Sequence, residues 1–485
     1  MIDPLRNGRP PGKRERNPFA AYVSGKGWDR RKKVIRLLCP RIPGASLPGR
    51  LRRAFALFAV VLFLITAPFV PARASYFDTF GADASGMALG NAMAAISQGW
   101  GSVYYNPAAL ALSRDIEFSI GFFSANPNIT VDYAQGPEED LVPLPRRPAS
   151  LDTITGPAFG LVLPIQRLTP KRLPMPWAIG VGLFVPRQTM VTTRVIDQTF
   201  PFDVVFQERN ETLAFNLGIS TRITSAVYLG LSLVAQVYTP VDVQLTETAD
   251  SPVELATRFG APSLIGGILI RPLERLRVGL VYRQESKIES DWNVFVQTRF
   301  PLLPGDPDDA FSLYRQTTLV QKYVSGYAPE NIALGAAYKI TERWRISGEL
   351  TWYRWSHYGG PYDAGLLYEF NDTLVPRIGV IYRITRTLDA RAGFYYEPTP
   401  VTNQGTGFYP IGNDRFVPSV GVGYAFPAPW GILAKPLRVD GFFQYHILKD
   451  ETYNRAIPDN PFVRNPDLTS SGSVLHLGAE LTLCF

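Results

Sequence analysis

Hydrophobic and polar residues alternate along many segments of this chain. At its end, LHLGAELTLCF (475–485) places Leu, Ala and Phe on one face and His, Gly, Glu, Thr and Cys on the other, because successive side chains of a β-strand point to opposite sides. In a soluble β-sandwich the apolar face would be buried, whereas in an outer-membrane barrel it would face lipid. One strand does not decide between these two classes.

The same alternation recurs along the rest of the chain. In several segments charged residues share one face, as Asp389 does with Arg391 and Arg438 with Asp440. Opposite charges on one strand face suit a hydrated lumen, because burying them in a dry core or in lipid is costly. We predict fourteen strands, at residues 116–124, 157–165, 177–185, 212–223, 226–239, 264–271, 275–299, 330–340, 343–355, 374–384, 387–397, 416–427, 435–448 and 473–485.

The connections between these strands sort by length. Tight turns at 224–225, 271–274, 341–342 and 385–386 alternate with loops of roughly 18 to 32 residues, as the short periplasmic turns and long outer loops of a barrel do. A sandwich gives no reason for such sorting. Aromatic residues near strand ends fit the girdle at the membrane interfaces, and they are Trp352, Tyr353, Trp355, Tyr358, Phe442, Phe443 and Tyr445.

The first 74 residues are predicted to be a removable leader. They hold 16 Lys+Arg and 3 Asp+Glu, a net +13, so the remainder carries +7 minus +13, or −6, which argues against a nucleic-acid partner. The apolar run 54–67 lies between basic residues and Ala72-Arg73-Ala74, which predicts cleavage after Ala74. A retained anchor is the alternative. The long stretch ahead of the run indicates either an upstream start site or an extended leader.

Cysteine content and hydropathy further restrict the classes of protein that fit this sequence. Cys39 lies in the leader and Cys484 is alone in the mature chain, so no intramolecular disulfide is expected. Beyond the leader no stretch approaches about 18 consecutive apolar residues, so no membrane-spanning helix is expected either. Together with the sorted loops, this favours a multi-pass β-barrel in the outer membrane of a Gram-negative bacterium.

Residues 75–115 do not alternate. They are rich in Gly, Ala and Ser, with stretches such as 87–96 that are compatible with short helices. Trp100, Tyr104, Tyr105 and Leu110 would serve no purpose in a disordered periplasmic tail, which is the alternative, so we expect a plug inside the barrel. The prediction is an all-β fold: a 14-stranded antiparallel transmembrane β-barrel (116–485) with a small N-terminal helical hatch (75–115) in its lumen, after a leader (1–74).

Two parts of the chain resemble the FadL family of outer-membrane transporters of long-chain fatty acids and aromatic hydrocarbons. One is the hatch motif Asn106-Pro107-Ala108 within SVYYNPAAL. The other is the C-terminal series RAGFYY (391–396), TPV (399–401), NDRF (413–416) and GVGY (421–424). The resemblance implies a plugged fourteen-stranded barrel that captures a hydrophobic ligand on outer loops and releases it sideways at a kinked third strand.

On this sequence the third strand is Trp177–Val185. Gly180 and Gly182 are compatible with a weakened or bent ladder there, and ordinary barrel packing is the alternative. For the capture site, apolar residues gather on loops that should be polar, which is typical of a ligand surface. Packing of the loops on one another is the alternative. The candidate capture residues are Leu255, Phe259, Leu302, Leu303, Phe311 and Leu313.

The predicted partners are a hydrophobic small molecule, outer-membrane lipid and the barrel assembly machinery. With an even strand number both barrel ends are periplasmic, so the last strand can close against the first. Phe485 on the lipid face resembles the C-terminal signal that the assembly machinery recognises on many barrels.

Other function classes are less well supported. A hydrolase would need a nucleophile and a base, yet the chain has only His357, His446 and His476; the latter two form a possible lumen pair without a nucleophile motif. No closely spaced ligand cluster predicts a metal, and no cofactor is expected. A structural or secretion-partner barrel remains the alternative to a transporter, and a plug argues against a general porin. The identity of the ligand stays open.

Introducing charge into the predicted capture surface tests its role. We expect Leu302→Asp and Phe311→Asp each to weaken capture of a hydrophobic ligand, because a carboxylate replaces an apolar surface that gains roughly 0.8 kcal/mol for each ligand methylene it covers. Ligand affinity of the purified barrel is the measurement, and unchanged affinity in both variants would remove the loop site.

Overall fold

The structure is a computed structural model. It describes residues 81–133, 147–149, 153–169, 174–185, 203–204, 213–237, 253–256, 262–300, 313–359, 369–402, 410–427, 435–453 and 468–485, all within one compact unit, Phe69–Phe485. The predicted leader and the first residues of the predicted hatch lie outside these ranges.

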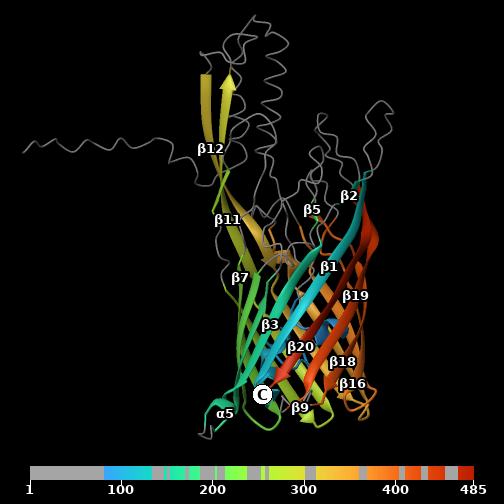
Figure 1. Cartoon of the computed structure of the whole chain (residues 1–485). Coiled ribbons are helices and arrows are strands. Elements are labelled where there is room, and N and C mark those ends of the chain that lie inside the picture. Colours follow the sequence, from blue (N-terminus) through green and yellow to red (C-terminus); the bar gives the residue numbers. More distant parts are fainter. Residues whose placement is uncertain are drawn as a thin grey trace, which may run out of the picture. The chain divides into compact units, whose positions relative to one another are not determined.

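Fourteen antiparallel strands form a closed ring in which β1 pairs with both β3 and β20 (Figure 1). The predicted barrel is therefore confirmed, and every predicted strand has its counterpart. In chain order the ring holds β1 (Glu117–Tyr133), β3 (Ile154–Pro164), β4 (Trp177–Phe184), β6 (Leu213–Arg222), β7 (Val227–Val237), β9 (Ser263–Leu273), β10 (Leu276–Arg283), β13 (Asn331–Lys339), β14 (Trp344–Tyr353), β15 (Thr373–Arg383), β16 (Leu388–Glu397), β18 (Arg415–Phe426), β19 (Leu437–Tyr453) and β20 (Leu468–Cys484).

One predicted loop is in part a strand. The predicted strand 275–299 is two strands, β10 and β11 (Ser286–Phe300), and the predicted loop 300–329 contains β12 (Leu313–Ala328), which pairs with β11 along its length. Since β12 leads directly into β13, this hairpin continues two neighbouring ring strands (Figure 1). The sequence did not predict β12, because residues 313–328 mix polar and apolar positions without clear alternation.

Four short strands lie outside the ring. They are β2 (Arg147–Ala149), paired with β1; β8 (Val253–Ala256), paired with β11; and β5 (Asp203–Val204) with β17 (Pro410–Ile411), which pair in parallel. The helices within the described ranges are α3 (Ala84–Ala88), α4 (Ser102–Tyr105), α5 (Ile165–Leu168) and the 3₁₀ helices η2 (Pro107–Leu112) and η4 (Trp355–His357). None of the helices in the described ranges is long and apolar enough to cross a bilayer.

The outside of the ring is apolar. On β1 the outward Phe118, Ile120 and Phe122 are exposed, while the residues between them are buried toward the lumen, and the other strands repeat this pattern. Exposed apolar side chains on every second residue of a closed ring are what lipid contact requires, and they exclude a soluble sandwich. Phe485 is exposed beside β1, and its backbone N–H donates to the Ile116 carbonyl at 2.9 Å.

The aromatic residues predicted for the girdle do not all face outward. Phe443 and Tyr445 are exposed, whereas Tyr353, Trp355, Tyr358 and Phe442 are buried. Tyr353 and Phe442 occupy the inward phase of β14 and β19, while Trp355 and Tyr358 follow the end of β14 and pack into the interior cluster. At the short-turn end the exposed Trp344 instead packs against Tyr382, with ring centroids 4.4 Å apart.

The predicted hatch lies inside the ring. Residues 81–112 touch strands on every side of the closed circle, which only an enclosed segment can do (Figure 1). Trp100, Tyr104, Tyr105 and Leu110 are all buried, as the sequence predicted.

Glycines make the space for this segment. Ten strands each place at least one glycine where a Cβ atom would meet hatch atoms at 3.1 Å or less; we call this set the glycine belt, and it comprises Gly160, Gly180, Gly182, Gly218, Gly230, Gly267, Gly279, Gly335, Gly379, Gly393 and Gly421. Because the absence of a side chain allows backbone and plug to approach closely, the belt fixes the depth at which the hatch sits.

Two neighbouring glycines of β9 provide a matched test of the belt. In Gly267→Ala the new methyl group would overlap the Asn106 amide and lie 2.9 Å from Pro107, whereas in Gly266→Ala it would meet nothing within 4 Å. We expect Gly267→Ala to loosen the hatch by about 1–3 kcal/mol, seen as faster proteolysis of residues 81–112 in a folded barrel, with Gly266→Ala unchanged. Equal proteolysis of both variants would contradict the proposed role of the glycine belt in seating the hatch.

Candidate functional site: the hatch and the lumen around it

Local sequence determines where the hatch turns. Asp83 caps α3 by accepting the Ser85 N–H at 2.9 Å, and burial raises the pKa of its carboxyl. Asn106 caps η2, with Pro107 at the first helical position, where its missing N–H costs nothing. Gly90 and Asn91 have positive φ and reverse the chain between α3 and the segment that follows.

Asn106 joins three parts of the molecule. Its side-chain amide donates to the Ala94 carbonyl at 2.6 Å and to the Ile268 carbonyl of β9 at 3.2 Å, and its oxygen accepts the Ala108 N–H at 3.1 Å. The side chain is fully buried, so each of these groups would otherwise lack a partner. The predicted motif residue Pro107 lies against Gly230 and Gly267, and Ala108 is buried beside them.

Two glutamates of the barrel wall hold hatch N–H groups. Glu349 of β14 accepts the Met93 and Ala94 N–H groups at 2.9 and 2.7 Å. Glu480 of β20 accepts the Ala84 N–H at 3.2 Å and the Trp100 indole N–H at 2.8 Å. Carboxylates that accept two donors in a buried site form strong, directed bonds, so these glutamates fix the hatch at two places, on strands five apart around the ring.

Arg283 of β10 holds the end of α4. Its guanidinium donates to the carbonyls of Tyr104 and Tyr105, each at 3.1 Å, and to Asn331 at 2.9 Å. It also lies 4.9 Å from the centre of the Tyr104 ring. A cation at the C-terminal end of a helix satisfies its unpaired carbonyls. Strand wall and hatch are thus joined by charge-assisted hydrogen bonds as well as by apolar contacts.

The lumen has one apolar side. Toward the long-loop end of the hatch, the inward positions of three adjacent strands carry only apolar residues, all at most 5% exposed. We call this surface the apolar wall; it comprises Phe123, Ala125, Ile129 and Val131 of β1, Ile154 and Ala158 of β3, and Phe184 of β4. Barrel interiors of this size are normally polar, so an apolar stripe is a specific feature.

The remaining strands also place polar and charged residues in the lumen, beginning at β20, which pairs with β1. Arg377 pairs with Glu349 at 3.3 Å and donates to Thr351 at 2.6 Å. His446 Nε2 lies 3.2 Å from His476 Nδ1, so the predicted histidine pair is close. It connects through Gln444 to the hatch, since the Gln444 amide donates to the Met87 carbonyl at 3.2 Å, and the described residues place no metal-binding cluster there.

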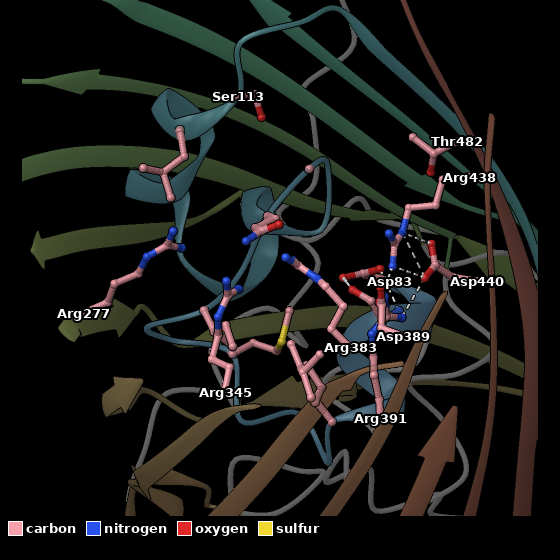
Figure 2. A pocket seen from close by; sticks show the side chains of 18 of the residues that line it. Asp83, Ser113, Arg277, Arg345, Arg383, Asp389, Arg391, Arg438, Asp440 and Thr482 are labelled. Atoms are coloured by element: carbon pink, nitrogen blue, oxygen red, sulfur yellow. Dashed lines mark hydrogen bonds and ion pairs between the residues drawn. The ribbon is translucent and has the colours of Figure 1, made fainter. Parts of the chain in front are cut away.

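A cavity of about 580 Å³ lies on the short-turn side of the hatch (Figure 2). Four charges form a network on one side of it: Arg391 pairs with Asp389 and Asp440, and so does Arg438, at 2.7–2.8 Å. This confirms that the charged residues predicted to share a strand face point into the lumen. Arg277, Arg345 and Arg383 line another part of the cavity (Figure 2).

The predicted weak ladder at the third strand is not found. β4 pairs in unbroken register with β3 on one side and β6 on the other, through both Gly180 and Gly182. Both glycines face the hatch: a Cβ atom would lie 2.5 Å from Val103 at Gly180 and 3.0 Å from Trp100 at Gly182. They accommodate the plug and do not interrupt the strand.

The predicted capture residues are only partly within the described ranges. Phe259, Leu302, Leu303 and Phe311 lie outside them. Leu255 belongs to β8, opposite Trp292, and Leu313 opens β12, opposite Phe300. Their role as a capture surface stays a prediction.

The family model for "Outer membrane protein transport protein (OMPP1/FadL/TodX)" matches residues 63–485. The chain belongs to this family. Its members are transporters of hydrophobic compounds rather than enzymes. A search of curated protein sequences gives no match.

Solved FadL and TodX structures have the same fold. A Pseudomonas aeruginosa FadL homologue is 16% identical with a TM-score of 0.54, and the match covers 85% of this chain and 98% of that one. The P. putida toluene transporter TodX is 15% identical with a TM-score of 0.51, covering 82% and 98%. At these identities the likeness supports the barrel and not a shared ligand.

In this FadL/TodX family member, several side chains of the barrel wall bind the hatch, and the sequence did not predict these contacts. Periodicity places Arg283, Glu349 and Glu480 on lumen faces, but their hatch partners are about 180 to 400 positions away in sequence. The apolar wall could have been noticed, since the inward positions of β1, β3 and β4 are all apolar or glycine beyond Ser119.

The Asn106 contacts can be tested by removal. We expect Asn106→Ala, and likewise Pro107→Ala, to leave the barrel folded and to reduce uptake, because Asn106→Ala leaves buried carbonyl and N–H groups unpaired at about 1–3 kcal/mol. Asn126→Ala is the control, since within the described residues that amide bonds Ser124 and Thr153 and no part of the hatch. Heat-modifiable mobility reports the folded barrel, and normal uptake by both hatch variants would remove the role of the motif.

Proposed function

We propose that the protein takes up long-chain fatty acids or similarly hydrophobic compounds, captures them on its outer loops, passes them along the apolar wall and releases them sideways near β4. Membership of the family supports transport of hydrophobic compounds in general. The apolar wall supports the proposed route of the ligand through the lumen. A water-filled channel has no use for seven buried apolar side chains on three adjacent strands.

The hatch favours a sideways route. In the described residues it contacts all sides of the ring at the glycine belt, so a ligand arriving from the long-loop end meets a closed layer. The apolar wall lies on that same side and leads to β4. Each methylene that moves from water to such a surface gains roughly 0.8 kcal/mol, so an acyl chain or hydrocarbon would follow the wall and not the charged side.

The end of β4 supports an exit there. β4 has eight residues and β3 eleven, and the last bond between them joins the Val185 N–H to the Pro157 carbonyl at 3.0 Å. Within the described ranges, 154–156 of β3 therefore have a ladder partner only in β1. An opening beyond Val185 would connect the apolar wall with the bilayer without breaking the observed β4 pairs.

A pair of near-isosteric variants tests the wall. Val131→Asp puts a carboxylate on the apolar wall, and Thr373→Asp puts one on the inward face of β15 across the ring; both positions are buried. We expect uptake of a labelled hydrophobic compound to fall at least about tenfold, equivalent to ~1.4 kcal/mol, in Val131→Asp only. An equal decrease in both variants, with both barrels folded, would show that the wall has no special role.

A further inference from the structure

The cavity beneath the hatch is separate from the proposed uptake route. It is lined by turn residues such as Thr341 and Glu342 and by the underside of the hatch, whereas the apolar wall lies on the other side of the hatch. Its volume of about 580 Å³ is in the range of ligand-binding pockets. Nothing in the proposed uptake mechanism uses it.

Five adjacent strands each contribute one cation to this cavity. We call the set the basic arc; in ring order it comprises Arg271 of β9, Arg277 of β10, Lys339 of β13, Arg345 of β14 and Arg383 of β15. All five occupy inward positions near the short-turn ends of their strands. A continuous arc of one charge sign concentrates counter-ions in a confined space.

Most of the arc lacks a carboxylate partner. Lys339 pairs with Glu342 at 2.6 Å, and Arg271 lies 3.4 Å from the Tyr228 hydroxyl. Arg277, Arg345 and Arg383 make no side-chain hydrogen bond or ion pair within the described parts of the chain, and Nη1 of Arg277 is shielded from solvent without a hydrogen-bond partner there. The charges that act most on Arg277 are those of Arg345 and Arg271, which repel it.

The other side of the same cavity shows the contrast. There Arg391 and Arg438 are both fully matched by Asp389 and Asp440 (Figure 2). Acidic partners are therefore available within this lumen, yet in the described residues Arg277, Arg345 and Arg383 pair with none of them. Clustered, partly desolvated guanidinium groups without an anion are unfavourable, so an anion between them would be stabilised by charge-assisted hydrogen bonds.

Part of the cavity lining is apolar. Leu89, Met93 and Ile96 of the hatch line it, and so does Ile381 of β15, two residues before Arg383. A free inorganic anion would use the arc but not this surface. A molecule with an oxyanion head group and an acyl chain would use both.

We propose that the basic arc is a binding site for the oxyanion head group of an acyl amphiphile on the periplasmic side of the hatch, with Arg277, Arg345 and Arg383 as its ligands. A fatty-acid carboxylate and a phospholipid phosphate share this chemistry. The site does not depend on the capture loops or on the apolar wall, so it stands or falls separately from the proposed uptake route.

Photo-crosslinking of the purified full-length barrel tests the site. The probes are hexadecanoate, a lyso-phosphatidylglycerol and hexadecanol, each with a diazirine in the chain, and labelled peptides are mapped by mass spectrometry. The test variant is Arg277→Gln/Arg345→Gln/Arg383→Gln. The matched control is Arg275→Gln/Arg386→Gln, which removes two turn arginines that do not line the cavity. Single substitutions of the three arc residues serve if the triple variant does not fold.

We expect an anionic probe to label the hatch underside at 89–96, with at least about tenfold less labelling in the test variant and unchanged labelling in the control. The anionic probe that labels best identifies the source of the head group. Hexadecanol labelling as strong as the anions, labelling unaffected by the arginine substitutions, or no labelling at 89–96 would each overturn the proposal. Labelling of outer-loop peptides alone would leave uptake standing and remove this site.

Discussion

Closure of the ring, by pairing of β1 with β20, is the constraint on which the rest of this structure depends. A strand edge left open in hydrocarbon would expose N–H and C=O groups with no water to bind, at several kcal/mol each. The seventeen residues of β1 from Glu117 to Tyr133 pair in register with β20, and β3 takes the other edge over nine residues. Every strand face is then determined: outward positions meet lipid and inward positions meet the lumen and the hatch.

A closed ring of fourteen strands also encloses more space than strand side chains alone can fill, since lumen width grows with strand number. The hatch fills that space at one level, where glycines replace side chains around the ring. The buried hatch residues also make directed polar contacts with the strands, because a plug with apolar contacts alone would leave its backbone N–H and C=O groups unpaired. Glu349, Glu480, Arg283 and Asn106 supply those partners. The hatch divides the lumen into an outer part with an apolar wall and an inner part with a basic arc.

The sequence predicted the ring well, because lipid contact imposes strict alternation on every strand, and alternation is a local signal. It predicted the hatch from its lack of alternation and from buried-type aromatics such as Trp100. It failed where function or packing is non-local. The strand β12 has no clear period, and Tyr353 and Trp355 were placed at the interface by proximity to a strand end and not by phase. For Gly180 the sequence left a weakened ladder and ordinary packing both open, because its neighbour Val103 lies in the distant hatch segment. The partners of Glu349 and Glu480 depend on ring closure, which brings residues 255 and 396 positions apart into contact.

Transport of hydrophobic molecules by this barrel is tested most directly by mass spectrometry of small molecules that remain with the protein after gentle purification from outer membranes of cells grown on several carbon sources. A hydrophobic-compound transporter should retain a stoichiometric acyl chain or hydrocarbon. Recovery of bulk lipid and detergent alone, under every growth condition, would contradict it and would favour a structural or docking barrel built on the same fold.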